Sequence, residues 1–483
     1  MKNRMVTALG LLAVAAVVAA VASAATSVST PVNVTNSQFA ANEESLGMDP
    51  SGTLLAGAWN DWHYNDGCGF SYSTDGGTTW AAETFVPGMS LFTNDPNVPG
   101  TGTFPIVGDP AVAYNPRFGT FDVVCQAFGK KAGQIQLLAT TFDHTKADPA
   151  ADVNFSYGGA VGGAPAWTTP VAITTGKSNG SQKGSNGQLP DHEAIVVDTG
   201  TGGLHHYGRL YVAWAEFSGV GRSPINLAYS DDNGASWTGP IRVSDAGHQF
   251  DQDATPRIGV DGAVYVSFIN GPNEKSTKNN SAMVAKSTDG GTTWGPSMIA
   301  APIPNPTLSL PNAQYRGGTN VTSTVDQGSG KVVVVYDDAS TGTLNEYAVH
   351  TLAAGDLSSW SAPVRVKASA QTQFFPWLSS APNGRVDLVY YDRCDAGDTL
   401  NCVSLSSSTD SGATWSSVQL LNDGFDGDTF GACLAFVDPP DCKSYFLGDY
   451  IAVASTNTKA LALWTGNGPA TLDVFAGGAT FTP

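Results

Sequence analysis

Basic residues are scarce in this chain. Its 483 residues include 23 Lys and Arg against 42 Asp and Glu, which gives a formal net charge of −19 at pH 7. Loss of Lys2 and Arg4 from the N-terminus would leave 21 basic against 42 acidic residues, a net charge near −21. Such a surface repels phosphate backbones, so the composition argues against nucleic acid as a partner. The chain is not disordered, because 41% apolar residues and 11 Trp can build a large core.

Long apolar runs are also missing, apart from one at the N-terminus. Lys2 and Arg4 precede the apolar run Ala8–Ala22, which is too short to span a bilayer comfortably. Ala22-Ser23-Ala24 then offers a cleavage site of the Ala-x-Ala kind. We therefore predict a signal peptide over residues 1–24 and an exported protein, secreted or periplasmic, over residues 25–483. We expect it to be a soluble monomer without a membrane span after cleavage.

A cysteine metal cluster is the weaker interpretation of the six Cys, because no Cys-x-x-Cys spacing exists. In an exported chain six Cys indicate three disulfides, whose connectivity the sequence leaves open. Short loops favour Cys394–Cys402 and Cys433–Cys442, and this choice leaves Cys68–Cys125 as the third pair.

An eight-residue stretch is what the chain repeats most clearly. Ser73–Trp80 reads Ser-Thr-Asp-Gly-Gly-Thr-Thr-Trp and recurs letter for letter at Ser287–Trp294, with looser copies at Ser230–Trp237 and Ser408–Trp415. The shared Asp can accept backbone N–H bonds, the Gly supplies a positive φ, and the Trp covers apolar surface. The stretch is therefore predicted to be a hairpin turn.

This stretch resembles the Asp-box, or BNR, repeat of sialidases and other Asp-box β-propellers. In that superfamily the boxes are structural turns on the face away from the active site. The resemblance therefore implies a fold and says little about the chemistry.

Each box belongs to a unit of four short strands, and such units are propeller blades. We count seven units, of which the last, from Tyr450 to Ala476, lacks an outer strand. Thr30–Thr35 resembles the outer strands Gly239–Ser244 and Ala362–Lys367, so we predict that it completes the last blade and closes the ring. The prediction is an all-β, single-domain, seven-bladed propeller; the six blades of sialidases are the alternative.

The long insertions and the starts of the inner strands fall on the face opposite the boxes, which we predict to be the functional face. Aromatic faces stack on sugar rings, and paired carboxylates can do acid/base work at a glycosidic bond. Glu43 and Glu44 stand at the first of these strand starts. The candidate catalytic residues are Asp109, Asp191, His192, Glu193, Asp253, Arg316, Asp449 and Tyr450. The candidate substrate-binding residues are Asp61, Trp62, His63, Glu216, Trp377, Asp392 and Arg393.

Crowded carboxylates at this mouth would repel one another and raise some of their pKa values unless a cation or Arg316 offsets them. The mouth is therefore predicted either to bind Ca²⁺ or to hold a protonated carboxyl that can act as a general acid. A hydrolase that uses such a protonated carboxyl as its acid requires no cofactor. Capping of strand ends is the alternative role for the same side chains.

The resemblance implies a glycoside hydrolase of exo-sialidase-like type that acts on extracellular glycans. Sialidases clamp the sialic-acid carboxylate with three Arg, the first of them before the first box, whereas only Arg4 precedes Asp75 here. One alternative is a non-catalytic propeller that binds glycan or protein. Another is a polysaccharide lyase, in which His63, His192 and Tyr450 would be the residues to watch.

Overall fold

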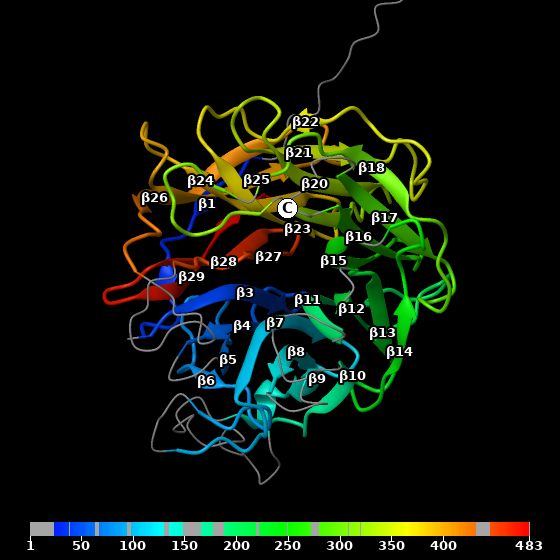
Figure 1. Ribbon diagram of the computed structural model, residues 1–483, viewed down its shortest axis with the longest axis vertical. Coiled ribbons are helices and arrows are strands. Elements are labelled where there is room, and N and C mark those ends of the chain that lie inside the picture. Colours follow the sequence, from blue (N-terminus) through cyan, green and yellow to red (C-terminus); the bar gives the residue numbers. More distant parts are fainter. Residues whose placement is uncertain are drawn as a thin grey trace, which may run out of the picture.

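Seven antiparallel sheets are arranged around one axis in the computed structural model (Figure 1). The structure describes residues 24–37, 39–62, 67–93, 98–129, 135–147, 166–176, 188–218, 222–248, 250–271, 280–307, 309–318, 320–430 and 445–482. The first blade consists of β3 (Ala41–Met48), β4 (Leu55–Asp61), β5 (Gly67–Ser73) and β6 (Thr84–Phe85). The second consists of β7 (Ile106–Asn115), β8 (Thr120–Phe128), β9 (Ile135–Phe142) and β10 (Val171–Thr175). The third consists of β11 (Gln188–Val197), β12 (Leu210–Ser218), β13 (Ile225–Ser230) and β14 (Thr238–Arg242). A short 3₁₀ helix, η1 (His144–Lys146), follows β9.

The remaining four blades follow in chain order, and each inner strand comes first in its blade. They are β15 (Asp251–Ile258), β16 (Val264–Asn270), β17 (Ser281–Ser287), β18 (Met298–Pro302); β19 (Val321–Val325), β20 (Val332–Asp338), β21 (Asn345–His350), β22 (Val364–Arg365); β23 (Gln373–Ser380), β24 (Val386–Arg393), β25 (Asn401–Ser408), β26 (Ser416–Phe425); and β27 (Ala452–Ser455), β28 (Lys459–Asn467), β29 (Leu472–Thr480). The predicted seven-bladed propeller is therefore confirmed, and the six-bladed alternative is wrong.

The N-terminal segment closes the ring as predicted. It supplies two short strands, β1 (Ser27–Val28) and β2 (Val32–Asn33), and both pair with β29. The register joins Ser27 to Thr480 and Val32 to Ala476. Figure 1 shows this blue segment beside the red C-terminal strands. The outer edge of the last blade is thus covered, which protects its unpaired backbone groups.

The four repeated stretches form the same turn. In the first copy, Asp75 Oδ1 accepts from the Ser73 hydroxyl at 2.8 Å and from the Thr79 N–H at 2.9 Å, and Asp75 Oδ2 accepts from the Thr79 hydroxyl at 2.6 Å. Gly77 has φ 89°, as the tight turn requires. Asp232, Asp289 and Asp410 receive equivalent bonds in the other copies. The predicted hairpin turn is confirmed.

Five inner strands share a bulge near their starts. In each, the pairing with the second strand shifts register, and one non-glycine residue adopts a positive φ between 47° and 62°. That conformation costs an ordinary residue roughly 1–2 kcal/mol and is concentrated at functional sites. The five residues are Glu43, Asp109, His192, Asp253 and Phe375. Three of them, Asp109, His192 and Asp253, are among the candidate catalytic residues chosen from the sequence.

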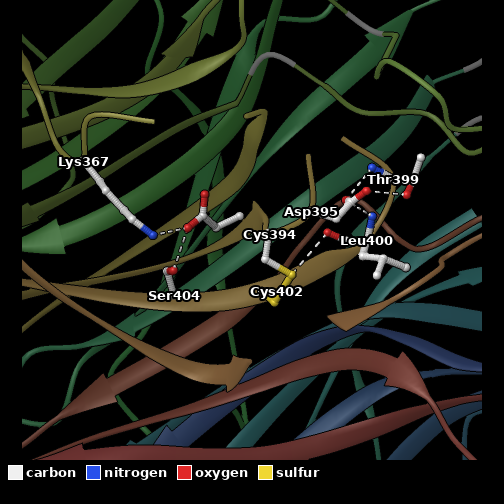
Figure 2. Close-up of a disulfide and its surroundings, with 8 residues drawn as sticks. Lys367, Cys394, Asp395, Thr399, Leu400, Cys402 and Ser404 are labelled. Atoms are coloured by element: carbon white, nitrogen blue, oxygen red, sulfur yellow. Dashed lines mark hydrogen bonds and ion pairs between the residues drawn. A yellow bond between two sulfur atoms is a disulfide. The ribbon is translucent and has the colours of Figure 1, made fainter. Parts of the chain in front are cut away.

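Two of the three predicted disulfides lie within the described residues. Cys68 on β5 bonds to Cys125 on β8 and joins the first two blades, and Cys394 bonds to Cys402. Figure 2 shows the second bridge beside Asp395, which accepts from the N–H groups of Thr399 and Leu400. Cys433 and Cys442 lie outside the described residues. The part of the chain that the structure describes contains no helix of the length and apolarity needed to cross a membrane.

Candidate active site

Three carboxyl groups from the first three blades form a hydrogen-bonded row at the mouth. Asp109 accepts side-chain hydrogen bonds from Glu43 and from Asp191. Asn60, at the end of β4, ties the row to the backbone: its amide donates to Glu43 and, at 3.2 Å, to Asp109, and its oxygen accepts from the Asp109 N–H at 2.5 Å. The bulges supply this arrangement, because they turn Glu43 and Asp109 from neighbouring blades toward each other.

Burial raises the pKa of every member of this carboxyl row. Desolvation is the largest cause for Asp191, whose pKa rises to about 7, and the neighbouring Asp109 adds to the rise. Burial likewise raises the pKa of Glu43 well above its usual value, again with Asp109 adding to it. Burial raises the pKa of Asp109 as well, while bonds from Asn60 and Glu43 oppose the rise. The row therefore holds protons that it can donate near neutral pH.

His192 and Asp253 form a second pair, between the third and fourth blades. The His192 Nδ1 lies 3.2 Å from Asp253 Oδ1, and Asp253 Oδ2 accepts from the Val321 N–H at 3.1 Å. Burial lowers the pKa of His192 to about 4 and raises the pKa of Asp253 to about 8. At neutral pH the two groups are therefore a neutral imidazole and a protonated carboxyl, and their contact is not an ion pair.

Tyr450 connects this pair to the carboxyl row. Its ring meets the His192 ring edge to face, with centroids 4.5 Å apart. Burial raises the pKa of the Tyr450 hydroxyl well above its usual value, and the charges of Asp109 and Glu43 add to the rise. The phenol therefore stays protonated and can donate a hydrogen bond.

Arg316 supplies the positive charge at the mouth. It contacts Asp449 through two nitrogens, with Nε 2.9 Å from Oδ1, and the Asp449 N–H donates to Glu43 at 2.9 Å. The Arg316 side chain is 62% exposed, and its guanidinium lies 5.0 Å from the Phe446 ring centre. Phe446 in turn meets Trp62 edge to face at 6.1 Å. We call Trp62, Arg316 and Phe446 the aromatic rim.

Several predicted site residues make their described contacts elsewhere. Glu216 accepts from the Trp214 indole at 2.8 Å, Asp392 pairs with Lys367, and Arg393 donates to the Tyr315 hydroxyl at 2.8 Å. Figure 2 shows Lys367 and Ser404, which share the Asp392 carboxylate. Glu216 contacts a neighbour in its own strand, and Asp392 contacts a lysine in the connection that precedes its blade. The structure does not bring them to the carboxyl row.

The other candidates lie around or below the mouth. Asp61 shares a side-chain hydrogen bond with Glu83, and Trp377 lines a cavity on the propeller axis. Glu193 lines the same cavity; burial raises its pKa well above the usual value, and the charges of Asp109 and Asp191 add to the rise. His63 lies outside the described residues.

Glu43 and Asn60 were not among the candidate catalytic or binding residues chosen from the sequence, yet they complete the carboxyl row. The signal for Glu43 was its place at an inner-strand start, the same place that Asp109 and Asp253 hold in their blades. The only sequence signal for Asn60 was its position at the end of the second strand of the first blade. Across the described ranges, no three His, Cys, Asp or Glu side chains are grouped so that they could hold a metal ion.

The chain matches no family model. It is 25% identical over 332 residues to a sialidase from Micromonospora viridifaciens, a match that covers 66% of this chain and 44% of that enzyme. It therefore spans less than half the length of this curated relative. Among solved structures it is similar to a protein of unknown function from Dyadobacter fermentans, with 14% identity, a TM-score of 0.48, and coverage of 94% and 98% of the two chains. It is also similar to Trypanosoma rangeli sialidase, with 10% identity, a TM-score of 0.45, and coverage of 91% and 55%.

Through its propeller fold and its sequence similarity to a sialidase, the chain resembles the sialidase-like superfamily at the level of the fold, as the repeat predicted. Its seven blades differ from the six of sialidases.

Proposed function

We propose that this protein is a secreted glycoside hydrolase of exo-sialidase-like type that acts on extracellular glycans at the propeller mouth. The observation that carries the proposal is the carboxyl row of Glu43, Asp109 and Asp191, which keeps protons near neutral pH because it is buried. The sequence similarity to a sialidase supports the reaction class. The signal-like N-terminus and the two disulfides support export.

In this proposal Asp191 is the general acid that protonates the leaving-group oxygen. Its pKa of about 7 leaves the carboxyl protonated in mildly acidic and neutral solution. Asp449 supplies the second carboxylate: a two-point contact with Arg316 holds it in place, and its charge acts on Asp191. The aromatic rim offers apolar faces on which a sugar ring can stack, and the exposed Arg316 can face an anionic substituent.

A polysaccharide lyase is the second candidate, and the contact between His192 and Tyr450 favours it. A lyase needs a base that removes the proton next to a uronic carboxylate and an acid that protonates the leaving group. The neutral imidazole of His192 can accept a proton, and the phenol of Tyr450 can donate one. Arg316 would then face the uronic carboxylate.

Incubation with a panel of sialylated, neutral and uronic-acid glycans separates these functions. Hydrolysis releases sugars with a new reducing end and no double bond, whereas a lyase produces an unsaturated sugar that absorbs ultraviolet light. We expect the hydrolytic products. Unsaturated products would favour the lyase, and tight binding to a glycan without any turnover would favour the non-catalytic binding propeller.

A further inference from the structure

A cavity of about 860 Å³ runs along the propeller axis beneath the mouth, and all seven blades line it. His192 and Tyr450 lie at the end next to the active site, whereas Tyr207 and Val260 lie at the end where inner strands turn into second strands. Tyr207 is 40% and Val260 47% exposed, so the far end opens between apolar side chains on the face away from the mouth. The volume is within the range of small-molecule sites, roughly 300–1,000 Å³.

Arg257 places a positive charge inside this axial cavity. It starts from β15 in the fourth blade and donates to three backbone carbonyls: Pro256 at 2.9 Å, Ser323 at 2.7 Å and Leu378 at 3.1 Å. Nη1 donates to Pro256, Nε to Ser323 and Nη2 to Leu378. A guanidinium has five N–H groups in all. Among the described residues, one N–H on each terminal nitrogen is therefore left for a ligand.

No carboxylate neutralises this guanidinium within the described part of the chain. Among the described residues, backbone carbonyls are its only hydrogen-bond acceptors, and burial alone lowers the pKa of Arg257 to about 10. By contrast, the buried Arg385 has two-point contact with Asp387. A desolvated cation without a counter-charge is costly to keep. An anion that enters the cavity would offset that cost.

Two of the three acids that line the cavity, Glu44 and Glu193, do not oppose an anion. The third, Asp49, lies in the turn after β3, at the same end as Tyr207; burial acts to raise its pKa, but hydrogen bonds from Ser51 and Leu54 lower it overall, so it stays charged. Glu193 is 7% exposed, and neither of its carboxyl oxygens has a partner among the described residues; Glu44 is 2% exposed and leaves one oxygen unpaired. Burial raises the pKa of Glu44 to about 8 and the pKa of Glu193 well above its usual value. Both are therefore neutral carboxyl groups at pH 7, able to donate to a ligand rather than repel it.

An apolar wall completes the surroundings of Arg257. The Trp377 ring centre lies 5.5 Å from the Arg257 guanidinium carbon, and Trp377 itself lines the cavity. A flat apolar group could pack along this ring while its charged end meets the two remaining N–H groups. We infer that the axial cavity is a second ligand site, which takes a small organic carboxylate with a flat apolar body through Arg257 and Trp377.

Calorimetric titration at pH 7 with benzoate tests this second site, and benzamide, which has the same shape without the charge, is the comparison ligand. We expect benzoate to bind at one site per chain and benzamide to bind much more weakly. Arg257→Gln should weaken benzoate binding about tenfold or more, because a hydrogen-bonded charge is removed. Arg242→Gln is the matched control: Arg242 also donates to the backbone carbonyls of Ser244 and Asp245, but it lies on the outer strand β14.

Equal binding of benzoate and benzamide, or unchanged benzoate binding by Arg257→Gln, would overturn the inference. Arg257 also holds three blades together, so its substitution could prevent folding. A crystal of the unaltered protein soaked with p-bromobenzoate decides that case. Bromine located beside Trp377 supports the second site, and bromine found elsewhere or nowhere overturns it. Both tests measure binding in the axial cavity, so their outcome does not depend on whether the mouth hydrolyses glycans.

Discussion

Asp191→Asn should make the protein more stable at neutral pH relative to the wild type. Burial raises the pKa of Asp191 from its ordinary 3.8 to about 7. A carboxyl with a raised pKa stabilises the folded state fully below pH 3.8, and this contribution is lost as the pH rises to 7. With 1.36 kcal/mol per pKa unit, the loss is at most about 4 kcal/mol. The asparagine amide cannot ionise, and its nitrogen can still donate to Asp109.

Urea unfolding of both proteins at pH 4, 5.5 and 7 measures this effect. The free energy of unfolding of Asp191→Asn, relative to wild type, should rise by up to about 4 kcal/mol between pH 4 and pH 7. Sharing of protons with Asp109 and Glu43 makes that figure an upper limit. Asp423→Asn, at an exposed position, is the control and should show no such trend. A stability difference that stays constant across this pH range would refute the assignment of a buried, protonated carboxyl at Asp191.

Three further outcomes are expected. Deletion of residues 26–36 should lower the melting temperature sharply, because it removes the strands that pair with β29; an unchanged melting curve would contradict closure by the N-terminus. Asp289→Ala should cost about 1–3 kcal/mol of stability through unpaired groups in its turn and leave glycan turnover intact, whereas a loss of turnover in a stable protein would give these turns a functional role. Added calcium should not raise the melting midpoint, because the raised pKa values of Glu43 and Asp191 keep these carboxyls protonated and protonated carboxyls bind cations poorly; a clear rise would support a Ca²⁺ site at the mouth.

The fold was predictable because the chain repeats its own plan. The Ser-x-Asp turns mark four blades, and the alternating apolar runs mark the rest. Even the closure of the ring could be predicted, because Thr30–Thr35 resembles two outer strands. The structure divides that segment into β1 and β2, a detail that the resemblance does not contain.

The candidate site was predictable only in part, because strand ends do not determine where a side chain points. Asp109 and Asp253 reach the axis through bulges with positive φ, a conformation that non-glycine residues rarely adopt and that no sequence signal marks. Glu216 and Asp392 also stand at strand ends, yet they turn to a Trp214 indole and a Lys367 ammonium. A shift of one residue in a strand moves a side chain to the other face of its sheet. Residue type therefore could not separate the two groups.

The rate of glycan hydrolysis as a function of pH tests the central claim most directly. For a substrate found in the glycan panel, we expect turnover to fall as the pH rises through about 7, because Asp191 must be protonated to act as the acid. Asp191→Asn should lower kcat by about 10²–10⁴-fold while the protein stays folded. Asp392→Asn, at a carboxylate outside the mouth, should keep the wild-type pH profile in whatever fraction folds. Full hydrolysis by Asp191→Asn, with the alkaline fall still present, would contradict the account.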